Sequence, residues 1–127
     1  MNSLIVGAIL VCVATPALAG AVDKMDEVIT SGEIREECHL AMPEPTVDEG
    51  ARFKASLHTI GQDAWHEMWT ELDKQDPSHH EANAKKAEFA LRYRTEDDME
   101  KAHSLVAEKG CAAIADHARD VLNSYLH

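Results

Sequence analysis

Apolar residues recur at three- and four-residue spacing through the middle of this chain, and the pattern predicts a long helix over residues 47–74. Six of these residues fall within about 120° of one another on a helical wheel. They are Phe53, Leu57, Ile60, Ala64, Met68 and Leu72. Just before them, Thr46 and Glu49 have the spacing of a capping box, in which a hydroxyl and an acid satisfy free amides of the first turn. We therefore expect an amphipathic helix that begins at this box.

The same hydroxyl-to-acid spacing occurs twice more and predicts two further helix starts. The pairs are Ser78 with Glu81 and Thr95 with Asp98, which would open helices over residues 79–93 and 96–126. On the first of these helices, the inward face would carry Ala82, Phe89 and Tyr93. On the second, the apolar face turns by about a third of a revolution near Gly110. A kink or a helix break is expected there.

The segment ahead of residue 47 is also predicted to be helical. We expect two pieces, over residues 21–30 and 33–42, with an interruption near Ser31 and Gly32 and with Ile34 and Cys38 facing inward. Strand alternation and hairpin dipeptides are missing from the sequence. The fold class expected is therefore all-α, a small bundle of four to five helices.

The N-terminal segment has the features of an export signal. An uncharged apolar run over residues 4–14 is followed by Pro16 and by the small-residue triplet at residues 17–19, which predicts cleavage before Gly20. The run is too short to cross a bilayer. We expect residues 1–19 to be a signal peptide, residues 20–127 to be one domain, and the protein to be secreted or periplasmic. The alternative is a membrane-tethered helix, because no Lys or Arg precedes Leu4.

Export changes the interpretation of the cysteines. After loss of Cys12, only Cys38 and Cys111 remain, and an oxidising compartment favours a disulfide between them. Free thiols and metal ligation are the alternatives. No Cys-x-x-Cys redox pair occurs.

All 12 basic and all 23 acidic residues lie after residue 19, so the expected mature chain keeps the net charge of −11. Such a charge repels phosphate backbones and anionic lipid headgroups. We expect neither nucleic-acid binding nor membrane binding after signal cleavage. A basic partner, a cation or solubility alone would suit this charge.

The eight histidines are the residues with the most chemical potential. On predicted helices, an acid precedes three of them by three residues, a spacing that places both side chains on one helical face. These pairs are Glu36 with His39, Asp63 with His66, and Glu100 with His103. Because Glu-x-x-His helices bind metals in some bundles, the candidate ligands for a transition metal are Glu36, His39, His66, Glu100 and His103. Solvated or structurally paired histidines are the favoured interpretation, since an acidic chain produces such pairs by chance.

Trp65 and Trp69 stand one turn apart, and His58 and Gln62 continue the same flank of the predicted long helix. These four residues are the candidate surface for an unknown protein partner or a small apolar ligand. Core packing is the alternative role for the two tryptophans. Since no nucleophile elbow or Gly-rich loop occurs, we do not expect an enzyme.

The sequence thus predicts an exported, non-catalytic binding protein without a resident cofactor. One alternative is a metal-binding bundle that uses the Glu-x-x-His pairs. A second is a pH-responsive chaperone or an inhibitor of the immunity type, because eight histidines would titrate together near pH 6.5.

Overall fold

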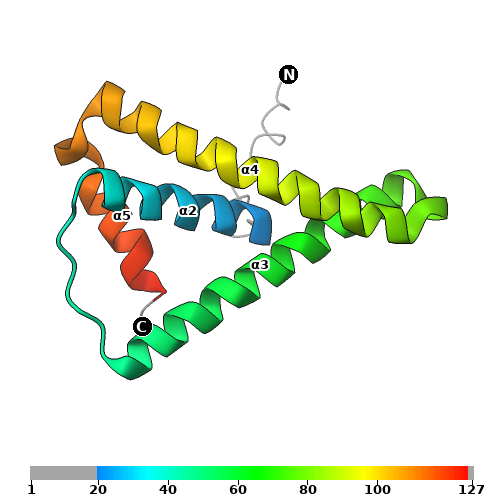
Figure 1. Cartoon of the computed structure of the whole chain (residues 1–127), viewed down its shortest axis with the longest axis horizontal. Coiled ribbons are helices and arrows are strands. Elements are labelled where there is room, and N and C mark those ends of the chain that lie inside the picture. Colours follow the sequence, from blue (N-terminus) through cyan, green and yellow to red (C-terminus); the bar gives the residue numbers. More distant parts are fainter. Residues whose placement is uncertain (1–19, 126–127) are drawn as a thin grey trace, which may run out of the picture.

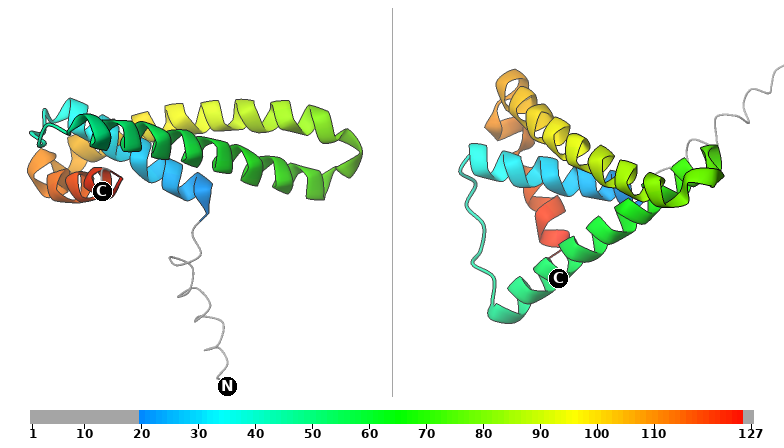
Figure 2. Two further views of the ribbon diagram at one scale, coloured as in Figure 1. Left: turned by 90° about the horizontal axis from the view of Figure 1, so that it is seen from below. Right: turned by 45° about the vertical axis from the view of Figure 1, so that its right-hand side comes forward.

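The computed structural model describes residues 20–125, and in this range the chain folds into four α-helices and one 3₁₀ turn. The order is α2 (Ala21–Glu37), α3 (Val47–Gln75), η2 (Pro77–His79), α4 (His80–Lys109) and α5 (Cys111–Ser124). Helices α3 and α4 form an antiparallel hairpin that opens away from its turn, and α2 lies between them (Figures 1 and 2). Because α2 contacts α3, α4 and α5, it is the central element of an all-α bundle.

The start of α3 confirms the first capping box. The Glu49 amide donates to Oγ1 of Thr46 over 3.1 Å, and the Thr46 amide donates to Oε1 of Glu49 over 2.9 Å. Pro43 and Pro45 lie in the loop just ahead, where they prevent α2 from continuing into α3. Local chemistry alone therefore sets this helix boundary.

Helix α2 is continuous, so the predicted interruption near Ser31 and Gly32 is wrong, as is the separate helix over residues 33–42. Ser31 is only 3% exposed, because small residues allow α2 to pack closely against its neighbours. Packing here outweighs the cost of about 1 kcal/mol that a mid-helix glycine carries. The helix ends at Glu37, and His39 takes a left-handed backbone conformation with φ of 50°.

Helix α4 is also continuous, which corrects the predicted boundary between residues 93 and 96. The Thr95 hydroxyl donates to the Leu91 carbonyl over 2.9 Å and therefore caps no helix start. The Ser78 hydroxyl likewise donates to Oδ1 of Asp76, so α4 begins at His80 without a side-chain cap. The break predicted at Gly110 is confirmed, because its φ of 83° and ψ of 151° end α4.

A different face of α4 is buried from the one the sequence predicted. The inward residues are small or polar: Asn83, Ala87, Asp98 and Ala102. Ala82, Phe89 and Tyr93 are exposed instead, at 53% for Phe89 and 68% for Tyr93. The prediction assumed a short helix that buries its largest residues. The real helix continues to Lys109, and its small-residue face allows α2 to approach closely.

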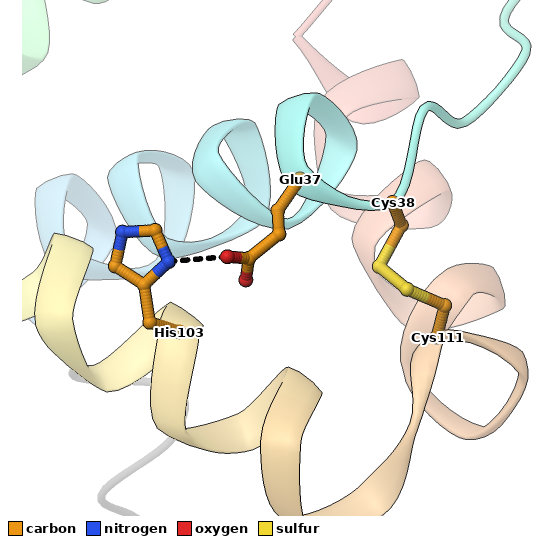
Figure 3. Close-up of a disulfide and its surroundings, with 4 residues drawn as sticks. All are labelled: Glu37, Cys38, His103 and Cys111. Atoms are coloured by element: carbon orange, nitrogen blue, oxygen red, sulfur yellow. Dashed lines mark hydrogen bonds and ion pairs between the residues drawn. A yellow bond between two sulfur atoms is a disulfide. The ribbon is translucent and has the colours of Figure 1, made fainter.

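The core lies where α2, α4 and α5 meet. Ile34, Ala102 and Ala118 form its centre. Partly buried residues pack around them: Cys38, Leu40, Leu105, Val106 and Ile114. The predicted disulfide is confirmed, since Cys38 and Cys111 are bonded with their Cα atoms 5.7 Å apart (Figure 3). The bond ties the end of α2 to the start of α5.

Within residues 20–125, none of the helices combines the length and the apolar character needed to span a lipid bilayer.

Candidate functional site

Trp65 and Trp69 lie between α3 and α4, where each joins the two helices. The indole N–H of Trp65 donates to the Ala84 carbonyl over 2.9 Å, and that of Trp69 donates to the His80 carbonyl over 2.8 Å. Their rings lie 5.0 Å apart, and the His80 ring stacks on Trp69 at 4.6 Å. Both tryptophans are half-buried. Their polar atoms therefore hold the hairpin together, and their remaining surface borders solvent.

A groove runs along the outside of the hairpin beside Trp65 and has a volume of about 520 Å³. It is lined by Gln62, Trp65, Glu88, Leu91, Arg92 and Thr95. Two of the four candidate residues from the sequence thus lie in one groove. His58 is exposed on α3 outside this lining, and Trp69 lies under His80.

Phe89 and Tyr93 are exposed on α4, one helical turn apart, and neither belongs to the groove lining. The Arg92 guanidinium lies 5.3 Å from the centre of the Phe89 ring and 3.6 Å from Oε2 of Glu88. Arg92 therefore links the groove to Phe89. We call Phe89, Tyr93 and the six groove residues the hairpin face. Sequence reasoning missed its aromatic part because it placed both rings in the core, and only an uninterrupted helix over residues 80–109 would have turned them outward.

The turn between α3 and α4 is fixed by a polar network. Asn83 is 1% exposed, and its amide donates to Oδ1 of Asp73 over 3.0 Å and to the Asp76 carbonyl over 2.9 Å. The Asn83 amide is the main cause that lowers the pKa of Asp73, and His80 adds to it. The His79 ring, whose Nδ1 lies 2.8 Å from Oδ2 of Asp76, is the main cause that lowers the pKa of Asp76. Both histidines are thus structurally paired.

The five candidate metal ligands are not gathered into one site. His103 reaches across to α2, but its Nδ1 lies 2.5 Å from Glu37 (Figure 3). Its Nε2 lies 3.5 Å from Glu33. Glu37 raises the pKa of His103. The other four candidates lie elsewhere: Glu36 and Glu100 are exposed, His39 follows the end of α2, and His66 lies on α3 beside Trp69. Throughout the part of the chain that the structure describes, no three His, Cys, Asp or Glu side chains could hold a metal ion together.

A second polar site joins α2 to α4, and no sequence motif indicates it. Arg94 donates from Nε to both carboxylate oxygens of Asp26 over 2.9 Å, and one of its terminal nitrogens lies 2.7 Å from Oδ2. Asp98 is next to this pair and only 7% exposed. Burial, followed by the hydrogen bond with Asp26, raises the pKa of Asp98 to about 7. This carboxyl group therefore holds a proton under mildly acidic conditions.

Comparison of the chain with protein-family models, with curated proteins and with solved structures gives no match.

Proposed function

We propose that this chain is an exported, non-catalytic binding protein that contacts a protein partner through the hairpin face. The observation that carries the proposal is the exposure of Phe89 and Tyr93, at 53% and 68%, on the same helix, α4, that supplies four residues of the groove containing Trp65. Aromatic residues and arginine supply most of the energy at protein interfaces, and this face combines them. Exposed aromatic pairs on a fixed helix are typical of such surfaces.

The hairpin is well suited to present a binding surface. The two indole N–H bonds and the buried Asn83 fix α4 against α3, so the hairpin face is held in one geometry before any partner arrives. A preformed surface loses little conformational entropy on binding. The rigidity of the hairpin therefore supports a binding role.

The partner we propose is a protein rather than a small apolar ligand. The groove is open, and the ion pair between Glu88 and Arg92 forms part of its lining. Small-ligand sites enclose most of their ligand in an apolar cavity. Phe89 and Tyr93 also lie outside the groove, where only a large partner would cover them together with it. The net charge of −11 favours a partner with basic groups at its rim.

Export is part of this proposal. The Cys38–Cys111 bond requires an oxidising compartment in most organisms, and the apolar run ahead of Gly20 would direct the chain there. Since α2 begins at Ala21, cleavage before Gly20 would remove no residue of the described helices.

Site-specific photo-crosslinking in the native host tests the binding surface. A photoreactive amino acid would replace Phe89 or Tyr93 in one pair of strains. Asp116, whose side chain on α5 is 96% exposed, would be replaced in a matched control strain. We expect one discrete crosslinked protein from positions 89 and 93 and none from position 116. The same band from position 116, or none from 89 and 93, would refute the hairpin face as the interface.

A pH response is a second candidate role, and the pair Asp26–Asp98 favours it. Asp98 and His103 both lie on α4 facing α2, and both bind protons more tightly in the folded chain than when free. Acidification would therefore tighten the packing of α2 against α4. A pH-responsive function of this chain would use a tightening at low pH rather than an acid-induced opening.

A further inference from the structure

The N-terminal end of α2 is held by a carboxylate from a different helix. Glu67 of α3 accepts hydrogen bonds from the Ala21 amide over 2.9 Å and from the Val22 amide over 3.3 Å. Gly20, the N-cap residue, offers no side-chain cap of its own. Glu67 therefore satisfies two of the amides that every helix leaves free at its start, and it places a negative charge at the positive end of the helix dipole.

Gly20 lies directly against this carboxylate. A Cβ atom built on Gly20 would lie 2.6 Å from Oε1 of Glu67 and closer still to Oε2. The Gly20 nitrogen is bonded to the same Cα atom, so standard bond lengths place it within about 6 Å of the carboxylate. A larger residue at this position would displace the Glu67 side chain.

Cleavage before Gly20 would change the chemistry at this point. Hydrolysis of the bond between residues 19 and 20 consumes one water and leaves a carboxylate on Ala19 and an α-amino group on Gly20. The amino group takes up a proton at neutral pH, since its ordinary pKa is about 7.7–8.0. A bare ammonium group would repel the positive end of the α2 dipole unless an acid neutralised it.

We propose that Glu67 is the acceptor for the α-ammonium group that signal cleavage creates at Gly20, so that export processing completes the junction between α2 and α3. This inference rests on the proposed export and on cleavage before Gly20. In the uncleaved chain the same nitrogen is an uncharged amide. The mature chain therefore gains an ion pair that its precursor does not have.

Other titratable groups lie around this junction. They are Asp23 and Lys24 on α2, Asp63 and Glu71 on α3, and Arg94 on α4, with Tyr125 after α5. Glu71 lies 3.5 Å from Lys74, which offsets its charge. Glu67 alone among the acids of α3 is hydrogen-bonded to the start of α2 in the structure.

The test is the pKa of the α-amino group in the mature protein, purified from the compartment to which it is exported. Mass spectrometry first identifies the N-terminal residue. Labelling of amines with ¹³C-methyl groups then allows the α-amino group to be titrated by NMR at low ionic strength. We expect a pKa at least half a unit above the ordinary value, which is a threefold gain in proton affinity.

Three variants make the test specific. Glu67→Gln should lower the α-amino pKa by at least half a unit, and Gly20→Ala should lower it as well by displacing the carboxylate without changing any charge. Glu71→Gln, one turn further along α3, is the matched control and should change the value far less than Glu67→Gln, because Lys74 offsets the charge of Glu71. Far-UV circular dichroism confirms that each variant is folded, and the wild-type titration decides the question even if a variant fails to fold.

The outcomes separate the two proposals. An N-terminus at another residue would overturn the cleavage before Gly20 and this inference with it. An N-terminus at Gly20 whose pKa lies at the ordinary value, and does not respond to Glu67→Gln, would overturn the ion pair alone and leave the export proposal intact.

Discussion

The two ends of this molecule are stabilised in different ways. The disulfide end, formed by α2, residues 98–109 of α4 and α5, holds the core of Ile34, Ala102 and Ala118 together with the Cys38–Cys111 bond. The hairpin arm, formed by α3 and residues 80–93 of α4, has little core. Ala64 is the one buried residue among the 29 of α3, and Leu57 is 37% exposed.

Hydrogen bonds take the place of apolar burial in the arm. Two indole N–H groups and the Asn83 amide connect α3 to α4, while large side chains such as Phe89 stay in solvent. The comparison indicates a division of roles within one small chain. The disulfide end supplies most of the stability, and the arm presents the surface that we propose binds a partner.

Loss of the disulfide should have the largest effect on stability. The bond joins residues 73 positions apart, and closing such a loop stabilises a fold by about 4 kcal/mol in the chain-entropy model. We expect the free energy of unfolding of the double variant Cys38→Ala/Cys111→Ala to be lower than that of the wild type by this amount. Urea unfolding followed by circular dichroism measures it. A loss below about 1 kcal/mol would show that the packing of the disulfide end suffices without the bond.

Truncation of matched aliphatic residues should distinguish the two ends. Ile34 is 4% exposed at the centre of the core. Its replacement by alanine should lower the free energy of unfolding by about 3 kcal/mol, because a cavity remains. Leu57→Ala in the arm should cost less than about 1 kcal/mol, since that side chain is already in contact with water. Equal losses in urea unfolding would contradict the division between core and arm.

Stability should fall as the pH rises, because of Asp98. Its pKa is about 7 in the folded chain against an ordinary 3.8, so folding binds a proton. The resulting stabilisation is fully present below about pH 4 and is lost as the pH rises to about 7. The raised pKa of His103 adds a loss of the same sign above about pH 6.5.

Replacement of Asp98 by asparagine tests this assignment. At pH 8 the variant should be more stable than the wild type by about 2 kcal/mol, because it removes a buried charge. At pH 4 the two should be alike. Urea unfolding at both pH values measures the difference, and an equal effect at the two would show that Asp98 does not hold the proton.

The smallest effect concerns the hydrogen bonds of the arm. Trp69→Phe keeps an aromatic ring but removes the N–H that donates to the His80 carbonyl, so we expect a loss of about 1 kcal/mol. Tyr93→Phe is the control, because its exposed ring should leave stability unchanged. Thermal unfolding of the Trp69→Phe and Tyr93→Phe variants measures this difference. Equal melting temperatures for the two variants would show that the indole hydrogen bond does not stabilise the arm.

Features that depend on a few neighbouring residues could be predicted from the sequence. The cap at Thr46 and the break at Gly110 are of this kind, and the disulfide followed from there being only two cysteines left to pair. The capping box predicted at Thr95 is wrong, because a hydroxyl inside a helix can equally well donate a hydrogen bond to the carbonyl four residues earlier. Local spacing does not distinguish these two uses.

The sites depend on contacts that no local pattern encodes. Asp26 and Arg94 are 68 residues apart, and their pairing follows from the close approach of α2 to α4. The outward position of Phe89 follows from the same packing, which selects the small residues of α4 for its buried face. Hydrophobicity alone favoured the opposite face.

Hydrogen exchange followed by mass spectrometry on the oxidised protein tests the division between the two ends most directly. We predict the slowest amide exchange in residues 22–34 and 115–122 of the disulfide end, and exchange at least tenfold faster in residues 48–60 of the arm, where few side chains are buried. Equal protection of these segments, or slower exchange in residues 48–60, would contradict the account.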